Sequence, residues 1–588
     1  MDLRAFRTTL AQHPLAYMSA EFALDDRLPI YSGGLGVLAG DIVRQANDLN
    51  LPFVAVGLLY KAGYFKQSIT LAGEQKEYYP ILESSDAPIE LVVNTEGERI
   101  LVRVPIQDRE VTIQIWEYCQ GDVSVYLLDT DVPENSPTDR LITQRLYDTR
   151  TDVRFLQEII LGIGGVRALM ELHIHPSIYH LNESHSALAI LEIAHHYMDE
   201  YGMSFDQAYE YGRQKIVFTN HTLVAAGNEC FPATVVTEQL SAYTKHISLA
   251  MDDVLKKGQL AADPTQFSLT VLALNMASRI NAVSKLHSVR AKLIWPDKDM
   301  IAITNGVNLP HWVNPDLKAQ APQFDSTAIN ALPPHELWQL HLMAKKRLVD
   351  EVKFQTGHVL NPDALIMTWA RRFADYKQPE LLFSDIEKLR AIVNNADKPV
   401  QLIMAGKAHP GDVIGHSHIH NIIKIIKDQK LSANIVFIQN YTISLASVLV
   451  SGVDLWINTP RRGEEASGTS GMKAGANGVL QCSVSDGWVD EVDLEGIGWI
   501  LPEAQTALAL YKMLETDIVP LYYNRNADKI PVEWVNRMKL TIGLIWGNFS
   551  AERMLSEYID IMYRPALEAE SMGKHEHNWR RNYRTRPI

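Results

Sequence analysis

Cysteine is scarce in this 588-residue sequence, and long apolar runs are absent from it. The three cysteines, Cys119, Cys230 and Cys482, lie too far apart for a disulfide framework or a zinc ribbon, and they suit a reducing compartment. No apolar run reaches the roughly 20 residues that a membrane-spanning helix requires. Residues 1–26 also lack the continuous apolar segment of a signal peptide. We therefore expect a cytoplasmic protein with no membrane partner.

Positive charge is also in deficit. The chain has 55 Lys and Arg against 70 Asp and Glu, a net charge of −15. A surface that follows nucleic-acid phosphates needs clustered positive charge, so we expect no nucleic-acid partner. The composition is otherwise that of a globular protein, with 46% apolar and 21% charged residues. At roughly 100–200 residues per domain, the length indicates two to four domains.

Short apolar runs alternate with amphipathic segments in both halves, which is typical of βαβ units and parallel sheets. The predicted parallel strands are Phe53–Leu58, Ile178–Asn182, Lys215–Thr219, Ile280–Leu286, Leu365–Ala370, Val400–Gly406, Ile435–Gln439, Val453–Asn458 and Gly478–Val484. Between residues 89 and 128, polar and apolar residues alternate, as in half-buried antiparallel strands. The expected fold class is α/β, with two doubly wound, Rossmann-like domains and a ligand cleft at the carboxyl ends of the strands.

A domain boundary is expected after Trp312. Residues 314–334 are rich in Pro, Ala, Gln and Asn, and a helical pattern resumes at His335. The predicted domains are residues 1–315, which include the β-rich insertion, and residues 316–560. Residues 561–588 are assigned to a tail with a basic end, and short tails of this kind are usually solvated or docked on their own fold.

Three runs of residues carry the chemistry. The first, Tyr31-Ser-Gly-Gly-Leu-Gly-Val, precedes a predicted helix, Val37–Leu49. Gly33 and Gly34 would let backbone N–H groups approach an anion at the helix N-terminus, although an ordinary tight turn has the same pattern. The third glycine of a dinucleotide-binding fingerprint is missing at the required spacing, so no nicotinamide site is predicted.

The second run, residues 369–377, directly follows a predicted strand. Arg371, Arg372 and Lys377 place three cations just beyond the carboxyl end of that strand, where they can collect phosphate oxygens. A solvated basic face is the alternative for a bare charge cluster. The position of the cluster after a βα strand of an acidic protein favours phosphate binding.

The third run, residues 464–478, begins with two glutamates and continues with small residues that have helix-capping side chains. The small residues precede a short predicted helix that carries Lys473, and they are Ser467, Gly468, Thr469, Ser470 and Gly471. A loop of this kind can hold a phosphate. A phosphate-binding loop with a nearby lysine is one way in which folds seat pyridoxal phosphate.

These runs, together with others in the same order and spacing, resemble the α-glucan phosphorylases that act on glycogen, starch or maltodextrin. The resemblance is strongest to their short bacterial and archaeal form. The matching blocks are Tyr17–Phe22, Tyr31–Gly36, Glu158–Ala168, His180–His185, Phe218–Thr222, Ile303–Val307, Arg371–Lys377, Ala405–Gly411 and Glu465–Gly478. The resemblance implies a GT-B glycosyltransferase architecture, in which two Rossmann-like domains face each other across a deep cleft.

The resemblance also implies a reaction. Orthophosphate would attack C1 of the terminal glucose of an α-1,4-glucan and release α-glucose 1-phosphate with retention of configuration. Lys473 would hold pyridoxal 5′-phosphate as a Schiff base, and the 5′-phosphate would relay the proton to the departing O4. Two phosphates so close together repel strongly at low dielectric, which explains the need for Arg371, Arg372 and Lys377.

Residue roles are implied in the same way. The catalytic residues would be Lys473, Arg372, Lys377 and His221. The cofactor would contact Lys473, Arg371, Lys377, Ser467, Gly468, Thr469, Ser470 and Tyr441. The substrates would contact Gly33, Gly34, Glu21, Asn305, Glu465, Glu183 and His185. A hydrogen-bonded structural role is the alternative for His185 and His221.

No metal site is predicted. His416 and His420 share a face of a predicted helix, but no third ligand follows at a suitable spacing. His195 and His196, like His173 and His175, are expected to be ordinary helix and loop residues.

Three positions depart from the long animal and plant forms. Gln378 stands where those forms have a basic residue, Ala374 where they have a histidine and Ser32 where they have an asparagine. The principal cations remain, so the phosphate site is expected to tolerate all three. Only sixteen residues precede Tyr17, so we expect the phosphorylation and nucleotide control of animal enzymes to be absent. Homodimer formation stays open, because much of the relatives' interface lies in segments that this chain lacks or shortens.

Two other interpretations compete with this one. A sugar-nucleotide glucosyltransferase such as glycogen or starch synthase would share the two-domain cleft, the glycine-rich loop and a glutamate near position 465, but it needs no Schiff-base lysine. A non-catalytic glucan-binding protein on a phosphorylase scaffold would have lost Lys473 or the phosphate-binding cations. All of these residues are present.

Overall fold

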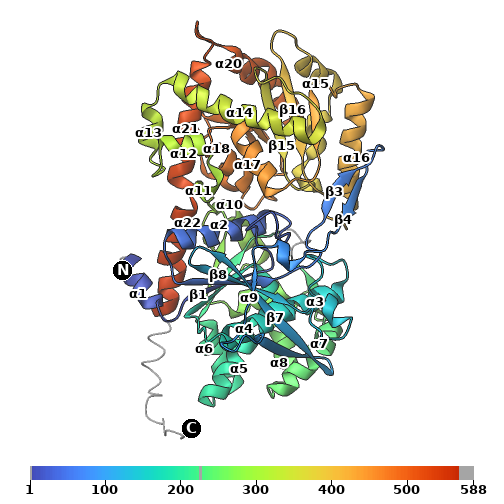
Figure 1. Cartoon of the computed structure of the whole chain (residues 1–588), viewed down its shortest axis with the longest axis vertical. Coiled ribbons are helices and arrows are strands. Elements are labelled where there is room, and N and C mark those ends of the chain that lie inside the picture. The colour runs from blue at the N-terminus through green and yellow to red at the C-terminus, as the bar shows by residue number, and fades with distance from the viewer. Residues whose placement is uncertain (1–2, 224–227, 569–588) are drawn as a thin grey trace.

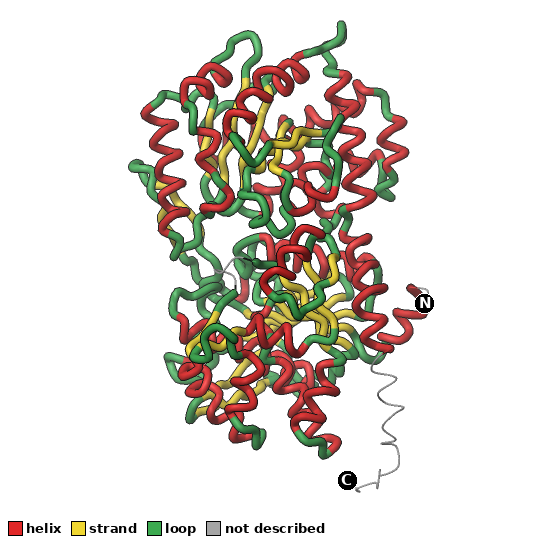
Figure 2. Tube along the Cα trace, turned by 180° about the vertical axis from the view of Figure 1, so that it is seen from behind, coloured by secondary structure: helices red, strands yellow, loops and turns green. Residues whose placement is uncertain are grey.

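Two hydrophobic cores, each surrounding its own β-sheet, make up the fold (Figure 1). The structure is a computed structural model, and it describes residues 3–223 and 228–568. Both sheets contain parallel strands and are surrounded by helices, as Figure 2 shows from behind. The chain is therefore a mixed α/β protein, which the alternation of apolar runs and amphipathic segments predicted.

The first sheet has ten strands, which are β1 (Leu15–Ser19), β2 (Phe53–Leu58), β5 (Glu90–Leu91), β6 (Leu101–Ile106), β7 (Arg109–Gln120), β8 (Val123–Asp129), β9 (Ile178–Asn182), β10 (Ile216–Asn220), β13 (Arg279–Ala282) and β14 (Ile301–Ala302). Its parallel part runs in the order β14-β13-β10-β9-β1-β2-β8. β8 then pairs antiparallel with β7, which also pairs with β5 and β6. The antiparallel insertion predicted between residues 89 and 128 is thus confirmed.

The second sheet has six strands, which are β15 (Leu365–Ala370), β16 (Val400–Ala405), β17 (Ile435–Ile438), β18 (Leu455–Asn458), β19 (Leu480–Val484) and β20 (Gly498–Leu501). All neighbours are parallel, in the order β17-β16-β15-β18-β19-β20. Every residue of β15 and β16 is buried. Strands covered on both faces have continuous apolar sequences, which is why the apolar runs predicted these two so closely.

Helices connect and cover the strands. Those between residues 3 and 312 are α1 (Leu3–Leu10), α2 (Gly34–Asp48), α3 (Thr151–Ile159), α4 (Gly165–Glu171), α5 (Ala189–Tyr201), α6 (Phe205–Arg213), α7 (Ala233–His246), α8 (Met251–Gly258), α9 (Leu269–Met276), α10 (Lys285–Ile294) and α11 (Leu309–Trp312). Those that follow are α12 (Pro315–Gln320), α13 (Ser326–Ala331), α14 (Pro334–Thr356), α15 (Ile386–Val393), α16 (Val413–Asp428), α17 (Ile443–Gly452), α18 (Thr469–Gly475), α19 (Thr506–Met513), α20 (Val519–Tyr523), α21 (Val532–Asn548) and α22 (Ala551–Glu557).

The strand predicted over Ile280–Leu286 is wrong at its end, because β13 stops at Ala282 and Lys285 already belongs to α10. The Ser284 side chain accepts a hydrogen bond from the backbone N–H of His287 at 3.1 Å and so caps the helix. The apolar run therefore passes from the strand into the helix. Residues 314–334, read as an irregular boundary, contain the short helices α12 and α13.

A segment near the end of the described chain returns to the first core. Residues between Ala551 and Ala566 pack there, although the preceding helix α21 belongs to the second core (Figure 1). Polar contacts fix the returning segment to the sheet: the Tyr563 hydroxyl lies 2.7 Å from Nδ1 of His180 on β9, and the Tyr558 hydroxyl accepts from Asn281 on β13 at 3.0 Å. The predicted tail at residues 561–588 lies outside the described residues from position 569 onward.

A hairpin from the first half reaches across to the second. Its strands are β3 (Lys66–Ile69) and β4 (Gln75–Tyr78), and it lies beside α16 in Figure 1. The Gln67 side-chain amide donates to the backbone oxygen of Gly406, and that of Gln75 to the backbone oxygen of Ala408, both at 2.9 Å. The hairpin thereby contacts the loop after β16. This loop lies next to residues 369–377, which contain Arg371, Arg372 and Lys377.

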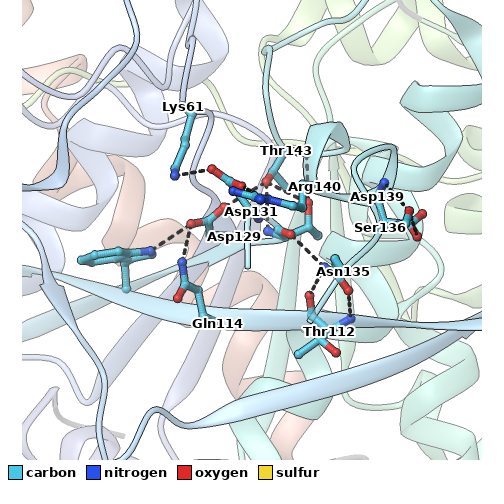
Figure 3. Close-up of polar contacts among 12 residues, drawn as sticks. Lys61, Thr112, Gln114, Asp129, Asp131, Asn135, Ser136, Asp139, Arg140 and Thr143 are labelled. Atoms are coloured by element: carbon cyan, nitrogen blue, oxygen red, sulfur yellow. Dashed lines mark hydrogen bonds and ion pairs between the residues drawn. The ribbon is translucent and has the colours of Figure 1, made fainter. Parts of the chain in front are cut away.

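The loop after β8 is held by a dense network of polar contacts (Figure 3). Asp129 accepts a hydrogen bond from the Gln114 side chain at 2.7 Å, and Asp131 forms ion pairs with Lys61 and Arg140. Asn135 bridges this loop to β7 through both the N–H and the carbonyl of Thr112. The rigid loop leads to Tyr147, which contributes to the site described next.

Candidate active site

The strand order of each sheet reverses at one place, between β1 and β9 in the first sheet and between β15 and β18 in the second. Ligands of open parallel sheets bind at the carboxyl ends of strands at such a reversal. In the first sheet, Glu21 follows β1 and Glu183 follows β9. In the second, Arg371 follows β15 and Asn458 ends β18. Most residues predicted from the motifs cluster at these two places.

The two buried cations of residues 369–377, Arg371 and Lys377, lie close to one carboxylate. Lys377 Nζ lies 2.5 Å from Oε2 of Glu465, and Arg371 Nη1 lies 3.7 Å from the same oxygen. Burial favours the protonated acid, but Lys377 and Arg371 hold the pKa of Glu465 below its ordinary value. Arg371 also donates to the Asn458 side chain and to Ser470 Oγ. Two cations facing a single carboxylate leave a net positive site.

The third cation of the run is placed differently. Arg372 is exposed and has no carboxylate partner among residues 3–223 and 228–568. Its charge acts on the hydroxyl groups of Tyr64, Tyr147 and Tyr376. Tyr147 donates a hydrogen bond to Glu21 at 2.8 Å. Arg372 therefore links the residue groups of the two sheets into one site, and its guanidinium bonds to the Tyr376 hydroxyl rather than to a carboxylate.

Polar groups in and around the loop before Lys473 lack hydrogen-bond partners. Ser467 Oγ, Arg371 Nε and Trp488 Nε1 are buried without a hydrogen-bond partner in the part of the chain that the structure describes. Gly468 has a φ of +79° at the start of α18, a conformation that favours glycine. A Cβ at Gly471, in the first turn of α18, would lie 2.8 Å from Oε1 of Gln481, so a larger residue there would require the Gln481 side chain to move. Buried donors without partners are costly, and an anion such as a cofactor phosphate would satisfy them.

Lys473 itself is buried, with 7% of its surface exposed. Its Nζ lies 4.4 Å from the centroid of the Trp312 ring. Burial lowers the pKa of its amine to about 8, although the Asp41 carboxylate opposes the shift. A substantial neutral fraction near physiological pH is what a lysine needs for Schiff-base chemistry. The residues present therefore fit pyridoxal phosphate: a nucleophilic lysine beside unpaired phosphate-binding donors.

The glycine turn faces a carboxylate of the protein itself. Oε2 of Glu21 accepts hydrogen bonds from the backbone N–H groups of Ser32 at 2.5 Å and Gly33 at 3.2 Å. A Cβ at Gly36 would lie 2.8 Å from the same oxygen. Gly34 is the first residue of α2. In this structure the N–H groups of the turn thus donate to a side chain of the protein, the carboxyl group of Glu21.

Glu183, which follows β9, and His221, which follows β10, form a hydrogen-bonded pair of neutral side chains. The Glu183 carboxyl accepts from the backbone N–H of His221 at 2.8 Å, and burial raises its pKa to about 8. Nε2 of His221 lies 2.6 Å from Oδ1 of Asn182 and must donate to it, which leaves Nδ1 as an acceptor. Burial lowers the pKa of His221 to about 3, so the ring is neutral. Glu183 has a φ of +72°, a strained geometry typical of functional positions.

The other predicted residues lie around these groups. Asn305 is buried, and its Oδ1 has no hydrogen-bond partner within the described residues. Nδ1 of His185 is unpaired in the same sense, and its ring lies 6.0 Å from that of Tyr147. The charge of Arg371 acts on the Tyr441 hydroxyl. Unpaired amide and imidazole groups at such a site are free to bind the hydroxyls of a sugar.

Among the contributors that the sequence did not predict, three carry acidic or phenolic groups. Tyr147 holds Glu21, Asp41 neighbours Lys473, and Asp486 accepts the backbone N–H groups of Gly463 and Glu465 at 2.9 and 3.0 Å. One of them had a usable signal: Asp41 lies seven residues after Gly34, on the same face of α2 two turns later. Asp486 and Tyr147 are in loops, where spacing predicts no face.

The fold and the site define a mixed α/β protein in which buried cations and unpaired polar groups lie around a buried lysine. A family model described as carbohydrate phosphorylase matches residues 154–496. The chain belongs to the carbohydrate phosphorylase family, as its motifs suggested. In the part that the structure describes, no helix combines the length and the apolarity needed to cross a membrane.

Similar proteins span nearly the whole chain. A maltodextrin phosphorylase of Thermococcus litoralis is 38% identical over 95% of this chain and 71% of its own length. A glycogen phosphorylase of Aquifex aeolicus is 35% identical over 95% of this chain and 87% of its own length. A glycogen phosphorylase of Mycobacterium tuberculosis is 33% identical, with coverage of 94% and 71%.

Proposed function

We propose that this protein is an α-1,4-glucan phosphorylase that transfers the terminal glucosyl unit of a glucan to orthophosphate and yields α-glucose 1-phosphate with retention. The observation that carries the proposal is the buried Arg371, Lys377 and Glu465 cluster beside the Lys473 loop, with its unpaired donors. Membership of the family and the names of the similar proteins support it. A sugar-nucleotide transferase needs no buried lysine at this place.

Each residue group has a role in this proposal. Arg372 binds the attacking orthophosphate, because its guanidinium forms no ion pair with a carboxylate that would have to break first. Lys377 and Arg371 hold phosphate oxygens once Glu465 turns to a glucose hydroxyl. Gly33 and Gly34 present N–H groups to an anion when Glu21 releases the turn. The glucosyl unit lies against Asn305, Glu183, His185 and His221, whose neutral rings and carboxyl suit hydroxyl recognition.

The cofactor in this proposal is pyridoxal 5′-phosphate, held by Lys473. The residues that would hold its phosphate and ring are Ser467, Gly468, Thr469, Ser470, Arg371, Lys377 and Tyr441. When bound, the cofactor would supply a phosphate group as the proton-exchange partner of orthophosphate. The protein excludes water from the lysine and keeps the cations fixed, which strengthens their effect on developing charge.

We further propose that the architecture is of the GT-B type, with two Rossmann-like domains that meet near residue 315. The strand orders, which reverse once in each sheet, support this division. The packing of residues 551–566 on the first core supports a first domain that includes this segment and a second that extends from near residue 316 to Phe549. The proposal includes a cytoplasmic location, with glucan and orthophosphate as ligands rather than nucleic acid or membrane.

Incubation of the purified protein with maltoheptaose and orthophosphate tests the reaction. We expect α-glucose 1-phosphate to accumulate in proportion to the phosphate supplied, with no free glucose when phosphate is omitted. Parallel reactions with nucleoside diphosphate glucose address the competing transferase. Glucose release without phosphate, or glucan extension from the nucleotide sugar alone, would contradict the proposal.

Arg372→Ala is expected to raise the phosphate KM by about 10- to 100-fold, because a hydrogen bond to a charged group is worth about 1.5–3 kcal/mol. The glucan KM should change little. Initial rates over a matrix of phosphate and maltoheptaose concentrations measure both constants. Arg461→Ala is the matched control: Arg461 is a nearby exposed arginine that pairs with Asp375, and its removal should leave the phosphate dependence as it is. An unchanged phosphate KM for Arg372→Ala would remove this residue from the phosphate site.

A further inference from the structure

A buried carboxylate lies beside Lys473 without any role in the proposed reaction. Asp41 belongs to α2 and has 1% of its surface exposed. Both of its oxygens accept from the Trp312 indole N–H at 2.9 Å, and Arg44 Nη1 lies 3.7 Å from one of them. The ring of the same Trp312 faces the Lys473 amine at 4.4 Å. Trp312 therefore lies between Asp41 and Lys473 and contacts both side chains.

The charges around the lysine come from two elements. α2 supplies the Asp41 carboxylate, which favours the ammonium form, and the Arg44 guanidinium, which disfavours it. α11 supplies His311, whose pKa is lowered to about 3 by burial and by the charges of Arg44 and Lys473, so that its ring is neutral. Burial raises the pKa of Asp41, while Lys473, Arg44 and the Trp312 N–H oppose the rise. The carboxylate and the amine thus stabilise each other's charged form.

A structural role alone explains only part of this arrangement. Trp312 could be held by any acceptor, and Arg44 is already bound to the backbone oxygens of Ala23 and Leu24 at 3.0 and 2.8 Å. A buried carboxylate is costly unless its charge is paired and hydrogen-bonded. After burial, the charge of the Lys473 amine has the largest effect on the pKa of Asp41.

We propose that Asp41 is a positioning residue that sets the proton affinity of the Lys473 amine and so fixes the pH at which this lysine accepts its cofactor. The inference deepens the proposed function and rests on it, because it takes pyridoxal phosphate as the cofactor. In the step concerned, the electron pair of the neutral amine forms a bond to the aldehyde carbon. Both amine hydrogens leave with the aldehyde oxygen as water, and a C=N double bond remains.

The test measures this step directly. Full-length protein is freed of carbonyl compounds with hydroxylamine, exposed briefly to pyridoxal phosphate at a series of pH values and trapped with borohydride. Mass spectrometry then quantifies the modified Lys473 peptide. For the native protein we expect labelling to rise with pH around a midpoint near 8, the pKa of the amine. For Asp41→Asn, which keeps an acceptor for Trp312, the midpoint should fall by about one pH unit because the stabilising charge is lost.

Two further variants sharpen the result. Asp48→Asn is the matched control, since Asp48 also lies on α2 and accepts from Asn308 at 3.0 Å but does not act on Lys473. Its midpoint should equal that of the native protein. Arg44→Gln removes the opposing charge and should move the midpoint to higher pH. Thermal unfolding identifies folded variants, and Asp41→Ser replaces Asp41→Asn if the latter fails to fold.

The outcomes separate the two proposals. A folded, uncharged Asp41 variant with the native midpoint would overturn the role of Asp41 and leave the cofactor assignment standing. If neither Asp41 variant folds, Arg44→Gln tests the same charge effect from α2. An unshifted midpoint in that variant would show that charges on α2 do not set the proton affinity of the Lys473 amine, and it would overturn the proposal. Native protein that acquires no label at Lys473 at any pH would overturn the cofactor assignment itself.

Discussion

Lys473→Ala protein is expected to retain no pyridoxal phosphate and to release no glucose 1-phosphate from maltoheptaose. The substitution removes the amine that the proposal assigns to the covalent bond, and it leaves the unpaired donors around Ser467 without their ligand. Loss of an essential proton-transfer group lowers rates by on the order of 10³-fold. Activity should therefore fall by at least that factor. Absorbance of the purified protein and a glucose 1-phosphate assay measure the two effects.

Lys473→Arg separates charge from covalent chemistry. An arginine keeps the positive charge beside Asp41 but cannot form the bond at neutral pH. We expect it to be as inactive as the alanine variant and better folded. Full phosphorolysis by either variant, without added cofactor analogue, would show that the covalent assignment is wrong.

Asp454→Ala is expected to lower the free energy of unfolding by about 3–5 kcal/mol, the cost of leaving a buried charge without its partner. Asp454 lies just before β18 and is fully buried in the second core. Its oxygens accept from Lys345 at 2.6 Å, from His341 at 2.8 Å and from the backbone N–H of Ile366 at 2.7 Å. Removal of the carboxylate leaves the Lys345 ammonium buried and uncompensated. Chemical unfolding followed by circular dichroism measures the loss.

Controls and acid titration define this effect further. Asp350→Ala removes an exposed carboxylate from α14, the helix that carries Lys345 and His341, and should change stability by no more than about 0.5 kcal/mol. Burial disfavours ionised Asp454, yet Lys345 and His341 hold its pKa below the ordinary 3.8. Its stabilising contribution is thus complete above pH 3.8 and is lost as the pH falls through the lower folded-state pKa. An Asp454→Ala protein as stable as the native one would show that the triad carries no net stabilisation.

The sequence predicted the buried parallel strands well and the exposed elements poorly. β15 agrees with the predicted Leu365–Ala370 at both ends, because a strand covered on both faces must be apolar throughout. β20 was not predicted, since Gly498–Leu501 is a short edge strand with a half-exposed centre. The β3–β4 hairpin has largely polar strands, Lys66–Ile69 and Gln75–Tyr78, which show no apolar pattern.

Some residues of the candidate site could likewise be predicted from the sequence, and others could not. Residues within one motif, such as Arg371 and Lys377, could be grouped from sequence because they follow one strand. Contacts between distant segments could not, since the Asp41 side chain meets Trp312, and Glu21 occupies the glycine turn only once β1 and α2 have packed together. Spacing along the chain specifies a face of a helix but not the partner that covers it.

The return of residues 551–566 to the first core has a consequence for biosynthesis. A ribosome makes residues 15–303, which supply all parallel strands of the first sheet, well before the segment that completes the packing against β9 and β13. The second core is continuous in sequence except for Ala23 and is finished by Phe549, so it can close as soon as it leaves the exit tunnel. We therefore expect the half that is translated first to reach its final form last. Until then it presents an open apolar groove where Met554, Tyr558 and Met562 will lie, which is a natural point of contact for a nascent-chain chaperone.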